Sequence, residues 1–322
     1  MRAIQVRRHG GPEVLELAEL DDPVPGQGEL LVRVAASGVN FVDTYKCAGV
    51  YPTPTPFVPG EEGAGIVLAA APGAGFAEGD RVGWCGVLGS YAELAVVPAV
   101  AAVPVPDELD DRRAAAALLQ GMTAHYLTTA SYPVREGDTV LVHAAAGGTG
   151  LLITQLVKAR GGAVIGTVST AAKEELARAV GADEIIRYTE VDDLAARVRE
   201  LTAGAGVAAV YDGVGRNTFD ASLASLRRRG TLVVFGASSG PVPPVDLQRL
   251  NAAGSVFLTR PKLADHVATR DELTWRAGEV LSAVVDGTLD IVIGASYPLA
   301  EARRAHEDLQ ARRTTGKLLI LP

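Results

Sequence analysis

The segment from His143 to Gly150 combines residue types that can hold a phosphate group. Its sequence, HAAAGGTG, follows the apolar run TVLVH and precedes the helix-like run TGLLITQLVKAR. A glycine triplet alone is equally typical of an ordinary turn, but a strand before it and a helix after it are the context that a phosphate-binding motif requires. Glycine lets the backbone approach a pyrophosphate, and the helix start offers free N–H groups. We therefore expect Gly147, Gly148, Thr149 and Gly150 to bind a dinucleotide.

The next turn bears on the choice of dinucleotide. Proteins that bind NAD place an acidic residue about 20 residues after the glycines, where it holds the ribose 2′-hydroxyl. Here the segment Gly166–Thr170 (GTVST) has no acid, and Lys173 follows it. A carboxylate would repel a 2′-phosphate, whereas the Ser169 hydroxyl and the Lys173 ammonium can bind one. This pattern favours NADPH over NADH, although Lys173 alone is also compatible with an ordinary solvated helix residue.

The elements that would position these residues alternate regularly from residue 139 onward. Apolar strand-like runs and helical segments of about ten residues follow one another, which predicts a doubly wound α/β domain with a parallel sheet covered on both faces. The expected strands are 139–143, 163–167, 184–187, 207–211, 231–235 and 255–258, and the expected helices are 149–160, 171–180, 191–201 and 217–227. Two helical segments, 114–119 and 123–129, precede them.

The first part of the chain has a different pattern. Apolar-rich runs at 30–36, 65–71 and 90–97 lie between Gly- and Pro-containing turns, which predicts a mixed, barrel-like β domain. The tail contains two expected helices, 272–286 and 300–311, and a last strand, 318–321, which we expect to return to the first domain. The domains are therefore expected at 1–121 with 265–322, and at 122–264.

Composition excludes several classes of protein. The 322 residues suggest roughly two domains, and the net charge of −8 without a basic stripe argues against a nucleic-acid partner. The N-terminus lacks the apolar segment of a signal peptide, and no apolar run is long enough for a membrane span. Two cysteines, Cys47 and Cys85, can form neither a disulfide framework nor a four-cysteine zinc site. We expect a soluble, cytoplasmic protein.

Several sequence blocks, nearly end to end and in one order, resemble the zinc-free quinone oxidoreductase (zeta-crystallin-like) branch of the medium-chain dehydrogenase/reductase superfamily. They are GVNFVDTY (38–45), GVYP (49–52), PGEEGAGIV (59–67), GDRV (79–82), SYAEL (90–94), QGMTAHYL (120–127), HAAAGGTG (143–150), VYDGVG (210–215) and LTRPKL (258–263). The resemblance implies a GroES-like mixed β-barrel catalytic domain beside a Rossmann domain, and a homodimer formed through the edge strand near 255–258. It also implies NADPH-dependent reduction of a quinone.

The resemblance also indicates that a metal site has been lost. Zinc alcohol dehydrogenases of the superfamily hold zinc with a Cys and a His at positions that here are Asn40 and Glu61. Neutral Asn is a poor zinc ligand. We therefore expect no metal, and we expect Cys47 and Cys85 to be small buried residues.

Site residues follow from the same resemblance. Asn40 and Tyr45 are expected to reach the nicotinamide ribose and the substrate, and to donate hydrogen bonds to the developing oxyanion. Tyr188 would lie beside the adenine, whereas we expect His143 to be satisfied in the core and not to act as a base. The other positions that match cofactor-lining residues are Thr128, Gly148, Thr149, Ser169, Lys173, Gly213, Phe235, Gly236, Ser238, Arg260 and Arg312.

Two alternatives stay open at the level of the sequence. One is an NADPH-dependent reductase of conjugated enones or enals, because such an acceptor resembles half a quinone. The other is a structural or RNA-binding protein, as some zeta-crystallin-like proteins are, although the charge of −8 argues against RNA. Whether electrons pass singly or as a hydride is also open. The segment 45–59 contains four prolines and is expected to be a stiff, irregular loop near the substrate.

Overall fold

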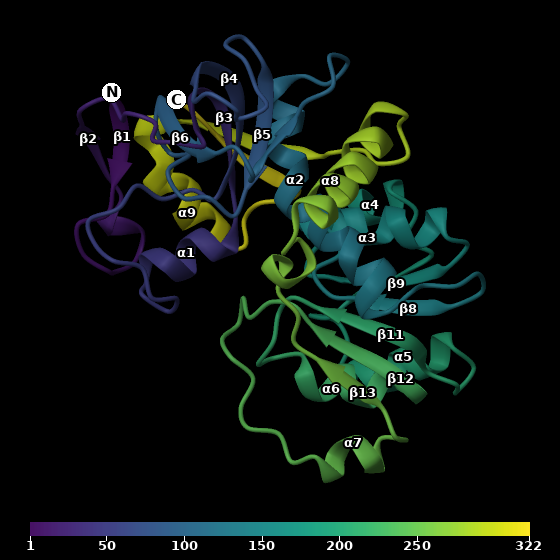
Figure 1. Ribbon diagram of the computed structural model, residues 1–322. Coiled ribbons are helices and arrows are strands. Elements are labelled where there is room, and N and C mark those ends of the chain that lie inside the picture. Colours follow the sequence, from purple (N-terminus) through teal and green to yellow (C-terminus); the bar gives the residue numbers. More distant parts are fainter. The chain divides into compact units, whose positions relative to one another are not determined.

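The chain divides into two compact units, and a computed structural model describes residues 1–322 (Figure 1). Unit 1 comprises Met1–Met122, Val267–Gly287 and Ile291–Pro322, and unit 2 comprises Thr123–His266 and Thr288–Asp290. No helix has the length and apolar character needed to cross a membrane.

Unit 1 is built on a mixed, mainly antiparallel sheet of seven strands with the order β14-β15-β3-β4-β5-β7, and β6 also pairs with β3. The strands are β3 (Glu29–Val39), β4 (Glu62–Ala70), β5 (Arg81–Cys85), β6 (Leu94–Pro98), β7 (Ala102–Pro104), β14 (Ile293–Pro298) and β15 (Lys317–Leu321). A separate pair is formed by β1 (Arg2–Gln5) and β2 (Glu16–Glu19). The helices are α1 (Phe41–Cys47), α8 (Arg270–Val285), α9 (Ala302–Gln310) and α2 (Asp111–Tyr126), whose last residues belong to unit 2.

The core of unit 1 follows from alternation along β3. Leu30, Val32 and Val34 are buried at every second position, so they lie on one face of the strand, where they pack with Val67 and Trp84. The last strand, β15, pairs with β14 on one side and with β3 on the other. The prediction that this strand returns to the first domain is confirmed.

Unit 2 contains a six-stranded parallel sheet with the order β10-β9-β8-β11-β12-β13. The strands are β8 (Thr139–Val142), β9 (Ala163–Val168), β10 (Glu184–Arg187), β11 (Val207–Asp212), β12 (Leu226–Val234) and β13 (Phe257–Thr259). The helices are α3 (Gly148–Ala159), α4 (Ala171–Ala179), α5 (Leu194–Leu201), α6 (Phe219–Ser225) and α7 (Gln248–Ala252). The expected doubly wound fold is confirmed, and β13 is an edge strand as expected.

Strand order in unit 2 reverses between β8 and β11, because β9 and β10 lie on one side of β8 and the later strands on the other. Ligands of open α/β sheets bind outside the carboxyl ends of the strands at such a switch point. The turns that follow β8, β9 and β11 are therefore the part of unit 2 where a dinucleotide would bind.

Three sequence predictions were wrong in detail. The helical segments 114–119 and 123–129 form one helix, α2, which a π-helical turn (Leu127–Ser131) extends. The segment that begins at Tyr45 is not irregular from its start, because Tyr45 lies inside α1. Strand β12 begins at Leu226, five residues before the expected 231.

Candidate active site

The turn after β8 has the geometry of a phosphate cradle. Gly147 is the extended residue before α3, with φ −79° and ψ 160°, and no side chain caps the helix start. A Cβ added to Gly150 would lie 2.4 Å from the Ala144 carbonyl oxygen and 2.9 Å from the Ala145 Cα. Both neighbours are backbone atoms, so only glycine allows this close approach. The free N–H groups at the start of α3 fit the pyrophosphate of NADPH.

The turn after β9 brings together the residues expected at the 2′-phosphate. Thr170 caps α4, and its hydroxyl accepts a hydrogen bond of 3.3 Å from the Lys173 backbone N–H. Ser169 therefore lies just before α4, and Lys173 lies in its first turn. The Tyr188 backbone N–H donates to the Val168 carbonyl at 3.1 Å, and the Tyr188 side chain is 43% exposed. The backbone of Tyr188 is thus joined to the strand that leads into the turn with Ser169, and the sequence of that turn, 166–170, contains no carboxylate.

The turns after β11 and β12 pack directly on each other. The Ser238 backbone N–H donates to the Gly213 carbonyl at 3.2 Å. A Cβ on Gly213 would lie 2.9 Å from the Phe235 ring, and one on Gly236 would lie 2.5 Å from the Gly213 carbonyl oxygen. The expected cofactor residues Gly213, Phe235, Gly236 and Ser238 therefore form one contiguous cluster.

A buried hydrogen-bond chain, which sequence reasoning missed, ties three of these strands together. The Asp212 carboxylate accepts from the Val214 and Gly215 backbone N–H groups and from the Ser222 hydroxyl at 2.8 Å. Because Ser222 donates to Asp212, its oxygen accepts from the Nε2–H of His143, 2.9 Å away. The Nδ1 of His143 then accepts from the Thr167 hydroxyl at 3.0 Å.

This chain confirms that His143 is a satisfied core histidine. Burial lowers the pKa of its imidazole, so the ring stays neutral and supports the turn after β11. An Asp at the end of a buried strand, directly before the glycines of DGVG, is the sequence signal that would have located this anchor.

In unit 1, Asn40 lies at the start of α1 and is 3% exposed. Its side-chain oxygen accepts from Lys317 Nζ at 2.7 Å and from Gln120 Nε2 at 3.2 Å. Its Nδ2 donates to Glu62 at 2.9 Å and, at 3.4 Å, to the Gly38 carbonyl. The expected donation from Asn40 to a substrate oxygen does not fit this arrangement, because both amide hydrogens are directed at groups of the protein.

Tyr45 has a different environment. It is half-buried, and its ring lies 5.9 Å from the Tyr51 ring in an edge-on arrangement and 6.3 Å from the Phe41 ring. Tyr45 is held by two aromatic rings, one from its own helix and one from the proline-containing segment that follows.

The positions where the superfamily holds zinc carry a donor set that does not fit the metal. The Glu61 carboxylate forms a short ion pair with Lys46, and the Asn40 oxygen faces the Lys317 ammonium. Asp43 accepts from the Asn40 and Glu61 backbone N–H groups, and burial together with the nearby Glu61 charge raises the pKa of its carboxyl to about 7. Zinc is bound through lone pairs of thiolate, imidazole or carboxylate groups. At these two positions the available oxygens, on Asn40 and Glu61, already accept hydrogen bonds from lysine ammonium groups.

Three other expected cofactor residues lie elsewhere in their units. The Thr128 hydroxyl is buried and donates to the Ala124 carbonyl at 2.9 Å. Arg260 follows β13 and is exposed, and Arg312 lies between α9 and β15, also exposed. Their contact with a cofactor stays a prediction.

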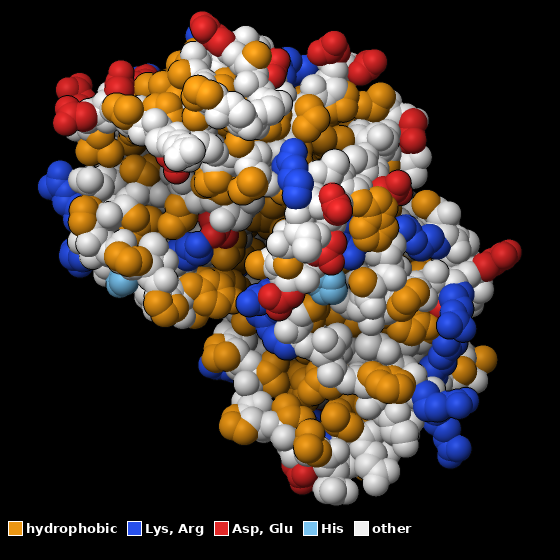
Figure 2. Space-filling model, in the orientation of Figure 1, with side chains coloured by type: hydrophobic (Ala, Val, Ile, Leu, Met, Phe, Trp, Pro, Cys, Tyr) orange, Lys and Arg blue, Asp and Glu red, His pale blue; other side chains and the backbone are white.

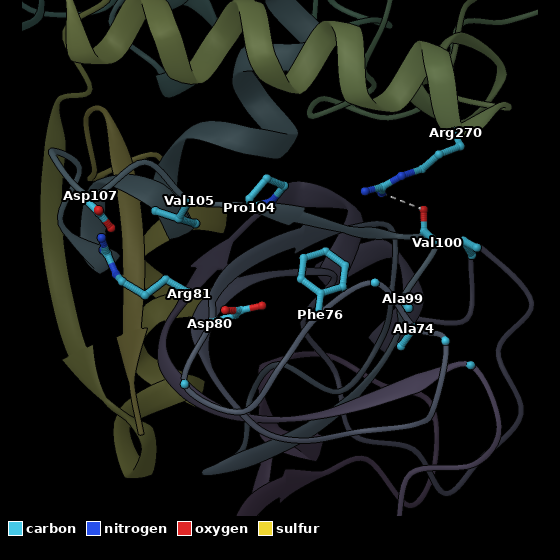
Figure 3. A pocket seen from close by; sticks show the side chains of 14 residues that line it. Ala74, Phe76, Asp80, Arg81, Ala99, Val100, Pro104, Val105, Asp107 and Arg270 are labelled. Atoms are coloured by element: carbon cyan, nitrogen blue, oxygen red, sulfur yellow. Dashed lines mark hydrogen bonds between the residues drawn. The ribbon is translucent and has the colours of Figure 1, made fainter.

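A separate cavity of about 810 Å³ lies on unit 1 and contains none of the expected site residues (Figure 3). Phe76 projects into it, and Arg270 borders it while donating to the Val100 carbonyl at 3.1 Å. The cavity is therefore distinct from the Asn40 and glycine-turn clusters.

Comparison with known proteins gives matches along the whole chain. Residues 26–107 match the alcohol dehydrogenase GroES-like domain, and residues 148–269 match the zinc-binding dehydrogenase domain. A quinone oxidoreductase of Pseudomonas aeruginosa is 45% identical, covering 100% of this chain and 99% of that protein. A 2-haloacrylate reductase of Burkholderia is 39% identical over 99% of this chain and 98% of that protein. A mycobacterial structure solved as a complex with NADPH is 53% identical, with a TM-score of 0.97 and 100% of both chains covered.

Proposed function

The chain belongs to the quinone oxidoreductase branch of the medium-chain dehydrogenase/reductase superfamily, and we propose how its residues serve the reduction of a quinone by NADPH. It is an NADPH-dependent oxidoreductase. The observation that carries the assignment is the glycine turn at the switch point of unit 2, followed by the acid-free turn with Ser169 and Lys173.

Cofactor binding is assigned to unit 2. The start of α3 holds the pyrophosphate, and Gly150 allows the backbone to approach it. Ser169 and Lys173 hold the 2′-phosphate by charge-assisted hydrogen bonds, while Tyr188 packs beside the adenine. Bound NADPH supplies the reducing equivalents, and the protein supplies orientation and exclusion of water.

The substrate end is assigned to unit 1. A quinone becomes an aromatic, delocalised anion on reduction, so it needs less electrophilic assistance than a ketone and no Lewis acid. Tyr45 is the expected hydrogen-bond donor to the developing oxyanion, because its phenol hydroxyl can donate and its side chain is half-buried. Water completes the protonation, so no obligate general acid is required.

The expected cellular setting and assembly also belong to this proposal. Cys47 and Cys85 are free thiols, as in proteins of the reducing cytoplasm. Acidic and basic side chains both occur over the face drawn in Figure 2, and the net charge of −8 disfavours a nucleic-acid partner. We expect a homodimer that forms through β13, the edge strand of unit 2.

The test is NADPH oxidation with a panel of quinones, alkenals and alcohols. We expect the highest kcat/KM with a benzoquinone or naphthoquinone, lower values with alkenals, and no NADP⁺-dependent oxidation of alcohols. A preference for alcohols would contradict the assignment.

A second candidate is the reduction of a conjugated carbon–carbon double bond. The Burkholderia relative, named 2-haloacrylate reductase, favours it, because an acrylate contains such a bond. Side-by-side kcat/KM values for a benzoquinone, an alkenal and 2-chloroacrylate separate the two functions. A value for either alkene above that for the quinone would establish the second candidate.

A further inference from the structure

The loop that follows α1 has an exposed, apolar tip, and it carries a ring that packs on Tyr45. Val50 is 65% exposed and Tyr51 is 40% exposed, and the Tyr51 ring lies 5.9 Å from the Tyr45 ring. The backbone N–H groups of Val50 and Tyr51 both donate to the Tyr45 carbonyl, at 2.9 and 3.4 Å. We call residues 48–53 the α1 arm. It begins directly on the helix of the expected oxyanion donor.

The N-terminal segment of the chain holds both ends of this loop. The Gly10 backbone N–H donates to the Cys47 carbonyl at 2.9 Å, at the end of α1. Val6 and Phe57 exchange two backbone hydrogen bonds, of 2.9 and 3.1 Å, where the loop ends. The N-terminal segment covers four residue steps between its two anchors and the loop covers ten, about 14 Å against up to about 35 Å of extended chain, so the loop must project.

His9 supplies a third anchor, in the middle of the projecting loop. Its Nε2 lies 2.9 Å from the Thr53 carbonyl oxygen, and because a carbonyl only accepts, Nε2 is the donor. The imidazole also covers Gly49, where an added Cβ would lie 3.0 Å from His9 Cγ and 3.1 Å from Nδ1. Thr53 is 7% exposed although it lies in a projecting loop. One side chain thus contacts the α1 arm near both of its ends.

Proline makes the position of the arm depend on this contact. Pro52, Pro54 and Pro56 have no backbone N–H, so they cannot donate hydrogen bonds that would hold the loop in another way. Their fixed φ angles stiffen the chain on both sides of Thr53. The Thr53 hydroxyl donates to the Tyr51 carbonyl at 3.3 Å, which links the anchored residue directly to the aromatic one. A support at Thr53 therefore also restricts the position of Tyr51.

We propose that His9 is a positioning residue that determines which acceptors fit beside Tyr45. By holding the α1 arm, it keeps the Tyr51 ring against the Tyr45 ring and limits the width of the planar acceptor between the arm and α1. This favours a single-ring quinone over a wider quinone of fused rings. The inference rests on the proposed function for the place of Tyr45 at the acceptor, whereas the support of the arm is a property of unit 1 alone.

The first experiment removes the imidazole. In His9→Ala we expect KM for 1,4-benzoquinone to rise at least fivefold, with kcat and NADPH affinity within twofold of wild type, because the cofactor contacts are assigned to unit 2. The ratio of kcat/KM for 9,10-phenanthrenequinone to that for benzoquinone should rise at least fivefold, because a released arm admits a wider acceptor. Arg8→Ala, which removes the exposed side chain next to His9, is the matched control and should leave every value unchanged.

Two further variants separate the hydrogen bond from a general loss of stability. In His9→Gln the amide nitrogen lies the same number of bonds from Cα as the imidazole Nε2 and can donate to the Thr53 carbonyl, so we expect KM and the acceptor ratio within twofold of wild type. His9→Leu has no donor and should resemble His9→Ala. Wild-type kinetics in His9→Ala and His9→Leu, or equal kinetics in His9→Gln and His9→Leu, would overturn the proposal.

Hydrogen exchange tests the support of the arm without reference to the reaction. The amide hydrogens of Val50 and Tyr51, which are bonded to the Tyr45 carbonyl, should exchange at least fivefold faster in His9→Ala and at the wild-type rate in His9→Gln. Equal rates in wild type and His9→Ala would overturn the role of His9. Faster exchange in His9→Ala together with a wild-type protein that reduces no quinone would overturn the proposed function alone.

Discussion

Tyr91 and His306 share a hydrogen bond of 3.1 Å in the core of unit 1, although they lie 215 residues apart in the sequence. Their rings meet edge-on at 5.7 Å. The Tyr91 hydroxyl also donates to Asp43 at 3.2 Å, so the Nε2 of His306 is the donor in its own bond to Tyr91. The pair thus connects helix α9, which carries His306, to Asp43 in the first turn of α1.

The buried imidazole of His306 makes stability depend on pH. Burial lowers its pKa from 6.5 to about 4. In the unfolded chain this histidine is protonated below about pH 6.5, whereas in the folded protein it is protonated only below about pH 4. The free energy of unfolding therefore falls as the pH decreases from 6.5 to 4. The loss amounts to about 3 kcal/mol at 1.36 kcal/mol per pKa unit.

His306→Gln should remove this part of the pH dependence, because the amide can donate to Tyr91 but does not titrate. The measurement is the free energy of unfolding from urea titrations at pH 4, 5, 6 and 7. Parallel curves for wild type and variant would refute the role of His306.

Lys173→Ala should weaken NADPH far more than NADH. The change removes a charge-assisted contact to the 2′-phosphate worth about 1.5–3 kcal/mol, or roughly 10- to 100-fold in affinity. Fluorescence titration with both cofactors measures it, and Lys158→Ala, on the neighbouring helix α3, is the control. Equal losses of affinity for the two cofactors would show that Lys173 does not contact the 2′-phosphate.

Gly150→Ala should abolish NADPH binding, because the new methyl group would meet the Ala144 carbonyl oxygen at 2.4 Å and displace the turn. The control is Gly278→Ala in α8, where a Cβ meets nothing within 4 Å. There we expect a gain of about 0.5–1 kcal/mol in stability from helix propensity and unchanged binding. Retained NADPH affinity in Gly150→Ala would place the cofactor elsewhere.

Tyr45→Phe and Tyr45→Ala separate two roles of one side chain. If the hydroxyl donates to the oxyanion, Phe should lower kcat by about 10-fold or more with little change in NADPH affinity. Ala should in addition raise KM for the quinone, because the ring that packs against Tyr51 is lost. Steady-state kinetics at saturating NADPH measure both, and wild-type values in both variants would exclude Tyr45 from the site.

Phe257→Lys should yield monomers. The Phe257 side chain is 61% exposed on edge strand β13, and a charge on an edge strand disfavours strand pairing. Sedimentation velocity at micromolar concentration compares the variant with wild type. A monomeric wild-type protein would contradict the expected homodimer.

The parallel sheet of unit 2 could be predicted because each strand is a local apolar run and each helix follows it directly. Helix α2 could not be delimited in this way, because Gly121 resembles a break. In the structure Gly121 serves close packing, since a Cβ there would lie 2.5 Å from Val280 Cγ1 of α8. Whether a glycine ends a helix or lies inside it thus depends here on packing against a segment that is distant in the sequence.

The site was predictable to different extents in the two units. The glycine turn and Ser169 are local signals, whereas the Lys317–Glu62 pair joins residues 255 positions apart. Its formation depends on the pairing of β15 with β3, and no short-range pattern indicates that pairing. Asn40 was singled out by its position in a motif, but the direction of its amide depends on this long-range contact.

The central place of β15 in the sheet of unit 1 has a consequence for biosynthesis. Unit 2 is almost one continuous stretch of chain, so it can fold on the ribosome as soon as it emerges. Strand β3 must wait for β15, which is translated after unit 2, before its pairing is complete. Nascent chains halted before Lys317 should therefore carry a folded nucleotide-binding unit and a protease-sensitive first unit, and translation of β15 should complete the sheet of unit 1.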